Sequence, residues 1–482
     1  MDSNPLGLAK ALLPKVPSLL STALFHTVGL TPNAKKWDLK TELVVTLIRS
    51  LLDSPKPSPI SKQQRNSLKD PGIRGPLWIS KVTIPKPEEE DVRRVLVEAV
   101  DAMKEGEEIY TVPEIASVEA EWTGWRAGVE KDRERLDLTE EQHYERLMKE
   151  VESDVTVLYF HGGAYFLMDP CTHRGTCAKL ARLTAGRCLS VRYRLAPQHA
   201  FPSALLDGLV SYLSLLSPPP GSYYKPVQAK HIVFAGDSAG GNLAICLLQL
   251  ILQLHRSSPT NPPTIRFHGR DVEVPLPAGV APNSGWYDVA RSMPSIYSNA
   301  KYDYLPPPLS NKFVARFPKC ELWPTNPPRG DIFCDISMFL HPLVSPVIAK
   351  DWRGACPVRM NYGTEMLLDE GKVLAKRIAN QGGIVIWEEY EAMPHCFNMI
   401  FEDSKAGKVC FESTAKFMRD VVEEKSLETS GKFIAAKTCK ETVVDVKNLD
   451  APSDEEVEKR IRDVMEKRAK GEEPETKMLP KL

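Results

Sequence analysis

Residues 236–240, Gly-Asp-Ser-Ala-Gly, place a serine in a glycine-flanked turn at the end of a predicted strand. The apolar run His231–Ala235 precedes the motif, and a helical pattern over Asn242–His255 follows it. A turn this sharp leaves no room for a Cβ atom at the flanking glycines, and it holds the serine hydroxyl at the carboxyl edge of a sheet. The motif therefore predicts Ser238 as a nucleophile. The alternative is a glycine-rich turn with an unreactive serine.

A second glycine-rich segment, His161-Gly-Gly-Ala164, directly follows the predicted strand Val155–Phe160. Attack on a carbonyl group creates an oxyanion, and each well-aimed backbone N–H group stabilises it by about 2.7–4 kcal/mol. We expect the N–H groups of Gly162, Gly163 and Ala239 to form this oxyanion hole. His161 precedes the serine in the chain, and we expect it to support the loop through hydrogen bonds.

The general base and its orienting acid are expected late in the chain. His395 follows the last predicted strand, Ile384–Tyr390, which completes the chain order serine, acid, histidine. Two candidate carboxylates, those of Glu365 and Asp369, follow the strand before it, Val358–Tyr362. Glu365 lies within three residues of that strand and is predicted to orient His395. Asp369 starts the next helix, and we expect it to cap that helix.

Strands alternate with helices through the middle of the chain, which is typical of a mainly parallel sheet covered by helices on both faces. Two further strands are predicted at Cys188–Tyr193 and Gly279–Pro282, and further helices at Thr176–Thr184, Leu205–Leu216 and Gly371–Asn380. Residues 1–115 instead suggest helices broken by prolines, such as Trp37–Leu52 and Glu88–Met103. We therefore expect an N-terminal helical region over 1–115 and an α/β core over 116–425.

Two segments fall outside this alternation. Residues 293–351, within the core, are rich in proline and aromatic side chains and too long for a simple connection, so they predict a lid or binding loop. Within the C-terminal extension, 426–482, a charged helix is predicted over 453–470. Its apolar stripe is thin, which favours a solvated helix over a partner-binding one.

The N-terminal segment Val16–Ala34 carries no formal charge but is interrupted by prolines, and the chain does not start with a secretory signal pattern. We expect helices that cover a core, with an interfacial membrane anchor as the alternative. The ten cysteines are dispersed without metal-site spacing, which is typical of a reducing compartment. A bridge between Cys320 and Cys334 is the alternative to free thiols.

The overall charge argues against one class of partner. The chain has 62 Lys and Arg against 63 Asp and Glu in 482 residues, a formal charge of −1. Such a balance gives no long-range field for attracting phosphates, so a nucleic-acid partner is not expected.

Four stretches together resemble the hormone-sensitive-lipase-like branch of the α/β-hydrolase superfamily, which includes microbial carboxylesterases, arylacetamide deacetylases and fungal steryl-acetate hydrolases. The stretches are Tyr159–Tyr165, Tyr193–Pro202, Ala235–Gly241 and Leu367–Glu370. The resemblance implies an α/β-hydrolase fold with a cap built from the N-terminal helices and the insertion at 293–351. It also implies Ser238 as nucleophile and His395 as base. The family usually has aspartate where this chain has Glu365.

These features together predict a serine ester hydrolase that needs no metal or organic cofactor. Aromatic residues in and near the insertion suggest a small hydrophobic ester with a short-to-medium acyl group; they are Trp286, Tyr287, Tyr297, Tyr302, Tyr304, Trp323 and Phe339. Amide or thioester hydrolysis and a non-catalytic receptor on the same fold are the alternatives. A cytoplasmic location is expected, with peripheral association with an intracellular membrane as the alternative.

Overall fold

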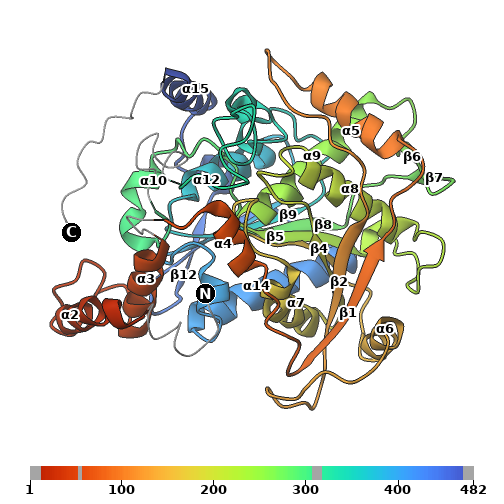
Figure 1. The fold of residues 1–482 in the computed structure, drawn as a ribbon. Coiled ribbons are helices and arrows are strands. Elements are labelled where there is room, and N and C mark those ends of the chain that lie inside the picture. The colour runs from red at the N-terminus through yellow and green to blue at the C-terminus, as the bar shows by residue number, and fades with distance from the viewer. Residues whose placement is uncertain (1–11, 53–56, 307–316, 471–482) are drawn as a thin grey trace.

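The computed structural model of the protein describes residues 12–52, 57–306 and 317–470. A ten-stranded sheet crosses the molecule in the order β1-β2-β4-β3-β5-β8-β9-β10-β11-β12 (Figure 1). The strands from β4 to β11 in this order are parallel, and β1, β2 and β12 extend the two edges through antiparallel pairs. Their bounds are Leu77–Ile84 (β1), Val118–Trp125 (β2), Thr156–Phe160 (β3), Arg187–Arg192 (β4), Ile232–Asp237 (β5), Gly279–Asn283 (β8), Val358–Gly363 (β9), Val385–Tyr390 (β10), Ser430–Ile434 (β11) and Glu441–Val444 (β12).

Helices cover both faces of this sheet because its central strands are apolar on both sides. In β3, Val157 and Tyr159 belong to one apolar cluster with α7 (Pro170–Thr184) and α14 (Lys405–Val422). Leu158 and Phe160 alternate with them and belong to the larger cluster with α8 (Ser203–Leu216) and α9 (Ala239–Ser257). The predicted α/β class and its mainly parallel sheet are confirmed.

The predicted central strands all occur within two residues of their expected bounds. Helix α7 begins six residues earlier than predicted. Asp169 explains the difference, since its side chain accepts from the Cys171 N–H and forms a capping box with Thr172. Helix α12 (Leu368–Asn380) likewise starts before Gly371.

The N-terminal region is not purely helical, which corrects the expectation for 1–115. Strand β1 pairs with β2 along its whole length, from Leu77 opposite Trp125 to Ile84 opposite Val118. The C-terminal extension also contributes to the sheet, since β11 pairs in parallel with β10. The sheet therefore reaches beyond the predicted core of 116–425 at both edges.

The predicted charged helix near the C-terminus is present as α15 (Asp454–Lys470), but it is not simply solvated. Val457 and Ile461 are fully buried in the large apolar cluster. Asp454 pairs with Arg377 at 2.5 Å, and Arg468 pairs with Asp331 at 2.9 Å. Val464 and Met465 are partly buried against the same cluster, so the whole thin stripe docks the helix.

Most of the described insertion belongs to the folded core. It forms short helices and turns, and Met338, Phe339, Val344 and Val347 are fully buried. Cys320 and Cys334 are free thiols, so the alternative of a bridge between them is wrong. Residues 307–316 of the insertion lie outside the described residues.

The remaining helices are α2 (Val16–Thr27), α3 (Leu39–Leu52), α4 (Ile60–Ser67), α5 (Asp91–Ala102), α6 (Glu140–Met148), α10 (Ser295–Ser298) and α13 (Phe397–Ile400). Of these, α2 and α3 lie at the lower left in Figure 1, and α5 and α6 lie at the right, on the side of β1 and β2. None of the helices formed by the described residues is both long and apolar enough to cross a membrane.

The docking of α15 can be tested with a matched pair of valines. Val457→Ala removes two buried methyl groups, at about 0.8 kcal/mol each plus a cavity term, so we expect the free energy of unfolding to fall by about 2 kcal/mol. Val443→Ala changes a side chain that is 85% exposed and should stay within about 0.5 kcal/mol of the parent. Urea denaturation measures both; equal losses would contradict the docked helix.

Candidate active site

Ser238 occupies a strained backbone position between β5 and α9. Its φ is 54° and its ψ is −119°, outside the regions that residues other than glycine normally adopt. The Ser238 N–H donates to the Asn283 carbonyl, and the Ser238 carbonyl accepts from the N–H groups of Asn242 and Trp286, each at 3.0 Å. These bonds hold the side chain at the carboxyl edge of the sheet, where it is partly exposed.

The glycines of the motif are required by the same turn. A Cβ atom on Gly240 would lie 1.9 Å from the Phe160 carbonyl oxygen, and one on Gly236 would lie 2.5 Å from the same atom. Both approaches are shorter than any real carbon–oxygen contact, so the end of β3 excludes side chains here. The structure thus agrees with the steric argument drawn from the motif.

Glu365 and His395 form a buried pair at the same edge. Glu365 follows β9 and His395 follows β10, the adjacent strand. His395 Nδ1 lies 2.9 Å from Glu365 Oε1, and the Glu365 side chain is fully buried. The carboxylate accepts a hydrogen bond from Nδ1–H, so in the neutral imidazole Nε2 is the nitrogen that can accept a proton.

Asp369 takes another role. Its Oδ2 accepts from the Ser295 N–H at 2.8 Å, and its own N–H donates to the Ser295 hydroxyl at 3.1 Å. It stands in the first turn of α12, whose N-cap position is Leu367. The expectation that Asp369 caps its helix is therefore wrong, because its carboxylate is used to hold the Ser295 backbone.

Two residues that the sequence analysis did not single out complete the surroundings of this pair. The Ser284 hydroxyl donates to Glu365 Oε2 at 2.8 Å and accepts from the Cys396 N–H at 3.1 Å. Asp303, fully buried, accepts from the His395 N–H at 3.3 Å and from the Met366 N–H at 2.9 Å. Neither residue belongs to a motif, so no local signal marks them.

The electrostatic setting favours charge on the imidazole. Burial alone would lower the pKa of His395, but the neighbouring Cys396 and Glu365 oppose it, and the pKa lies well above the usual value. Burial raises the pKa of the Cys396 thiol to about 12, so that thiol is neutral at physiological pH. Glu365 is then the group whose negative charge acts on His395. Burial raises the pKa of Glu365 itself, against the influence of His395.

The structure places Ser238 at the same edge as the pair, linked to it through the loop after β8. Asn283 and Trp286 hold the Ser238 backbone, and Ser284 between them holds Glu365. Among the residues that the structure describes, the Ser238 hydroxyl makes no direct hydrogen bond to His395. In free enzymes such bonds are often long and tighten only when substrate binds.

The loop after β3 differs in one respect from the expectation. The Gly162 N–H donates to Asp237 Oδ1 at 3.2 Å, so this predicted oxyanion donor is already engaged. The next residues turn their backbone, with φ of 107° at Gly163 and 52° at Ala164. Within the described part of the chain, the N–H groups of Gly163, Ala164 and Ala239 have no hydrogen-bond acceptor.

Asp237 anchors this loop from the serine motif. Its Oδ1 also accepts from the Tyr159 hydroxyl at 2.7 Å and lies 3.3 Å from His173 Nε2. Burial alone would raise the pKa of Asp237, but His173 and Tyr159 lower it below its usual value. Despite burial, Asp237 raises the pKa of His173. The two groups therefore form a buried ion pair beneath the loop.

His161 has the supporting role expected for it. Its Nδ1 lies 2.7 Å from the Gly162 carbonyl, and its ring stacks on Tyr193 at 4.3 Å between centroids. The Tyr193 hydroxyl donates to the His161 carbonyl at 2.6 Å. Burial lowers the pKa of His161 to about 4, so it stays neutral near pH 7.

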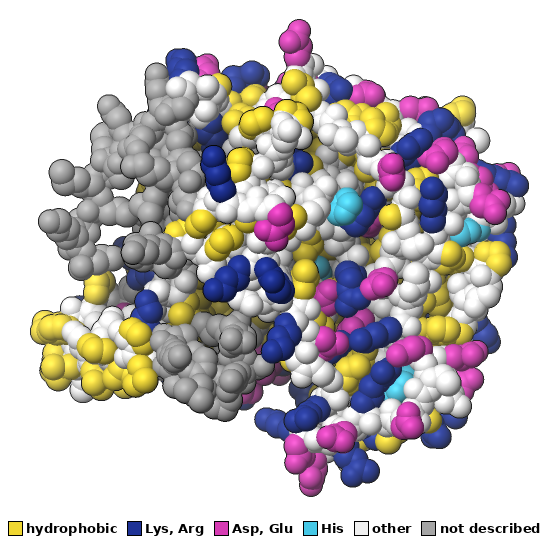
Figure 2. All heavy atoms as spheres, viewed as in Figure 1, with side chains coloured by type: hydrophobic (Ala, Val, Ile, Leu, Met, Phe, Trp, Pro, Cys, Tyr) yellow, Lys and Arg dark blue, Asp and Glu magenta, His cyan; other side chains and the backbone are white. Residues whose placement is uncertain are grey.

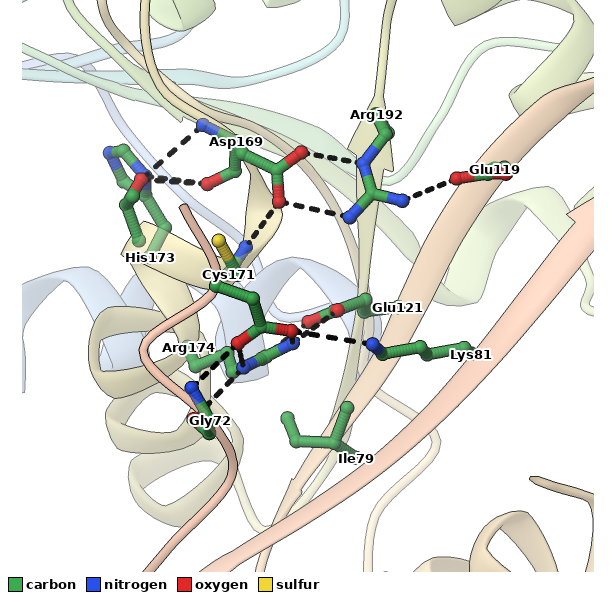
Figure 3. Close-up of polar contacts among 12 residues, drawn as sticks. Gly72, Ile79, Lys81, Glu119, Glu121, Asp169, Cys171, His173, Arg174 and Arg192 are labelled. Carbon is green, nitrogen blue, oxygen red and sulfur yellow. Dashed lines mark hydrogen bonds and ion pairs between the residues drawn. The ribbon is translucent and has the colours of Figure 1, made fainter. Parts of the chain in front are cut away.

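Further ion pairs hold the other end of the loop (Figure 3). The Asp169 carboxylate lies between Arg192 of β4, with Nε at 2.5 Å, and the Cys171 N–H at the start of α7. Arg174 of α7 lies between Asp70 and Glu121, each at 2.6 Å. These contacts fix α7 and the loop before it against β2 and β4.

A pocket of about 390 Å³ opens on the β4 side of this loop. Its lining includes His161, Met168, Asp169, Arg192 and Tyr193. Ser238, Glu365 and His395 do not line it, so we do not assign this pocket to the reacting groups. No three His, Cys, Asp or Glu side chains converge on a metal-binding arrangement among the described residues.

Three of the seven aromatic residues named from the sequence show that these side chains do not share one role. The Tyr304 ring lies 6.1 Å from the His395 ring, edge to face. Tyr287 and Phe339 are instead fully buried in the large apolar cluster. Of these three, only Tyr304 is placed next to the candidate base.

Comparison with known proteins agrees with this architecture. The family model for the alpha/beta hydrolase fold matches residues 157–399, just over half of the chain. The chain belongs to the α/β-hydrolase family. The predicted resemblance to its hormone-sensitive-lipase-like branch is confirmed, whereas the narrower similarity to fungal steryl-acetate hydrolases stays a prediction.

Individual relatives are more distant. An acetyl-hydrolase from Streptomyces hygroscopicus is 28% identical over 272 residues, covering 56% of this chain and 77% of its own. An esterase from Acinetobacter venetianus is 28% identical over 256 residues, which cover 53% of this chain and 71% of the esterase. The crystal structure of EstE5 soaked with p-nitrophenyl butyrate superposes with a TM-score of 0.54 at 21% identity, covering 80% of this chain and all of that one. At that identity the superposition shows the α/β-hydrolase fold alone.

The anchoring role of Asp237 predicts a loss of stability on Asp237→Asn. The substitution removes the charge that Tyr159, Gly162 and His173 share, so we expect the free energy of unfolding at pH 7 to fall by about 1–3 kcal/mol. Tyr159→Phe removes one of these hydrogen bonds and should cost about 1 kcal/mol. Urea denaturation measures both, and an unchanged Asp237→Asn variant would contradict the anchor.

The pH dependence of this difference has a defined sign. Folding lowers the Asp237 pKa, so the advantage of the parent protein is present above pH ~4 and shrinks as the pH falls through the folded pKa. Folding raises the His173 pKa, so the advantage also shrinks as the pH rises through that value.

Proposed function

We propose that the chain is a carboxylic-ester hydrolase in which Ser238 is the nucleophile, His395 the general base and Glu365 the acid that orients the base. The observation that carries the proposal is the 2.9 Å contact between Glu365 and His395 at the sheet edge where the strained Ser238 turn lies. The names of the acetyl-hydrolase and esterase relatives support the reaction class.

The chemistry follows from these positions. His395 Nε2 accepts the Ser238 proton while Oγ attacks the ester carbonyl carbon. The tetrahedral intermediate then expels the alcohol, which takes the proton from His395. Water attacks the resulting acyl-serine by the same route and releases the carboxylic acid, and Ser238 regains its proton.

The free N–H groups suggest a revised oxyanion hole. The Gly162 N–H already donates to Asp237. The N–H groups that remain available are those of Gly163, Ala164 and Ala239. Ala239 also starts α9, where the first N–H groups lack intrahelical partners and the helix dipole favours negative charge. We assign these three N–H groups to the oxyanion.

The substrate is a small hydrophobic ester with a short-to-medium acyl group, an assignment supported by Tyr304 beside His395 and by the name of the acetyl-hydrolase relative. Amide and thioester hydrolysis would use the same three residues. A non-catalytic receptor would need an unreactive Ser238 despite its strained position and the intact acid–base pair.

A fluorophosphonate probe tests the nucleophile, because it labels only a serine whose proton is removed by a nearby base. We expect one adduct on the peptide that contains Ser238, and no adduct in Ser238→Ala. Labelling of His395→Ala should be slower by at least about 10³-fold. Peptide mapping by mass spectrometry provides the measurement. Absence of an adduct on Ser238 in the folded protein would favour the receptor.

Two isosteric substitutions test the acid. Glu365→Gln should lower kcat/KM for p-nitrophenyl acetate by about 10³–10⁴-fold, because the imidazole loses its orienting charge. Asp369→Asn, the matched control, should stay within about tenfold, since Asp369 holds the Ser295 backbone instead. Equal losses would show that the acid is misassigned.

The pH profile supplies a second readout of the same pair. Only neutral imidazole accepts the serine proton, so the rate should rise as the pH rises through the elevated His395 pKa. Glu365→Gln removes the charge that favours the imidazolium, so the acidic limb of kcat/KM should move to lower pH. An unmoved limb would mean that Glu365 does not act on His395.

A further inference from the structure

Helix α2 exposes an apolar stripe that the fold does not use. Val16, Leu20, Leu24 and Val28 recur every four residues and therefore share one side of the helix, with Leu13 one turn before them. Leu20 and Leu24 are 66% and 64% exposed, and none of the residues of α2 is buried. Figure 2 shows the apolar side chains gathered over α2, at the lower left of the molecule.

The opposite side of α2 faces the protein, which fixes the direction of the stripe. His26 Nδ1 lies 3.1 Å from Glu42 Oε2 of α3, and the Thr31 hydroxyl donates to the same oxygen. Glu42 is buried, so its charge is satisfied between the helices. On a helix, His26 projects away from Leu24 and Val28. The stripe therefore points outward.

The charged residues around α2 are mainly basic. Residues 3–37 contain four lysines and no Asp or Glu, in a chain whose net charge is −1. Lys35 and Lys40 are exposed, while Lys36 pairs with Glu391 and Lys15 donates to the Ser50 carbonyl at 2.9 Å. Asp38 is the exposed acid near them, and it accepts from the Thr41 N–H. An apolar stripe in a segment with net positive charge is complementary to an anionic lipid surface.

We propose that the outward face of α2, defined as Leu13, Val16, Leu20, Leu24 and Val28, docks on an anionic membrane surface. Helix α2 has 12 residues, about 18 Å, which suits a helix lying in the interface plane rather than one that spans the ~30 Å apolar layer. The Leu side chains enter the acyl boundary, and the lysines contact the headgroups.

The chain that follows α2 contacts the candidate active site. The Trp37 indole N–H donates to the Ala392 carbonyl at 2.6 Å, in the loop that carries His395. Arg49 Nε donates to the Asp303 carbonyl at 3.0 Å, and Asp303 accepts from the His395 N–H. The segment after α2 and helix α3 are therefore tied to the loops that carry Glu365 and His395. The docking itself does not depend on Ser238 as nucleophile.

Flotation of the full chain with vesicles tests the proposal. We expect binding to phosphatidylcholine vesicles that contain about 30 mol% phosphatidylserine, and weaker binding to phosphatidylcholine alone or at high salt. Leu20→Asp/Leu24→Asp should lower the partition coefficient by at least about tenfold. Ile109→Asp/Val443→Asp is the matched control, since these side chains are 65% and 85% exposed elsewhere. This control should bind like the parent.

Folding is checked independently of activity, by circular dichroism and urea denaturation of each variant. If the leucine variant is unfolded, Lys35→Glu/Lys40→Glu tests the same surface and should reduce binding to anionic vesicles. Absence of parental binding, equal binding of the leucine variant, or equal binding to neutral and anionic vesicles would each overturn the proposal. A dimer detected by light scattering that depends on Leu20 and Leu24, without vesicle binding, would identify a second copy as the occupant instead.

Discussion

The close approach of α9 to the end of β3 is the constraint on which the candidate site depends. The Phe160 carbonyl lies where a Cβ atom on residue 236 or 240 would be. Both positions therefore require glycine. Ser238 then takes a positive φ at a cost of about 1–3 kcal/mol, which three backbone hydrogen bonds offset. Because α9 packs this closely against the end of β3, its first residue, Ala239, lies near the loop that follows β3. The positions of the proposed nucleophile and of the proposed oxyanion donor Ala239 thus follow from one packing contact.

Two buried carboxylates divide the remaining tasks. Asp237 holds the loop after β3 through Gly162 and pairs with His173, while Glu365 faces His395. Burying a carboxylate costs several kcal/mol unless donors surround it, and each of these has several. Because the donors come from different strand ends, neither loop can shift without exposing an unsatisfied charge. Rigidity at the site therefore follows from the desolvation penalty itself.

The sequence predicts what is local and misses what is not. The motifs at 161–164 and 236–240 each lie in one strand-to-helix turn, so their backbone could be inferred from glycine positions. The glycine-rich motif alone predicts the Gly162 N–H as an oxyanion donor. In the structure this N–H donates to Asp237, which is 75 residues away in the chain. Ala164 adopts a positive φ, which an alanine in the sequence does not predict. The distance from a strand end favours Glu365 over Asp369 as the orienting acid, and this assignment stays a prediction.

Long-range contacts explain the other differences between expectation and structure. Strand β1 has the alternating β-branched and aromatic side chains of a strand, yet it sits among proline-broken helices, and only its pairing with β2 identifies it. Helix α15 buries Val457 and Ile461 fully and Val464 and Met465 partly. The sequence shows this stripe but not the apolar surface that receives it. Ser284 and Asp303 were missed for the same reason, because their partners come from distant loops.

The N-terminal helices are linked to the candidate site through a buried acidic residue, Asp303. Asp303 binds the backbone on either side of the acid–base pair, at Met366 and His395, and its carbonyl accepts from Arg49 of α3. Helix α3 is therefore tied to the groups that orient the imidazole. Helix α2 has no such duty, since none of its residues is buried. Folding accounts for the side of α2 that faces Glu42 but not for leucines turned toward water, and an apolar face without a folding role indicates an external partner.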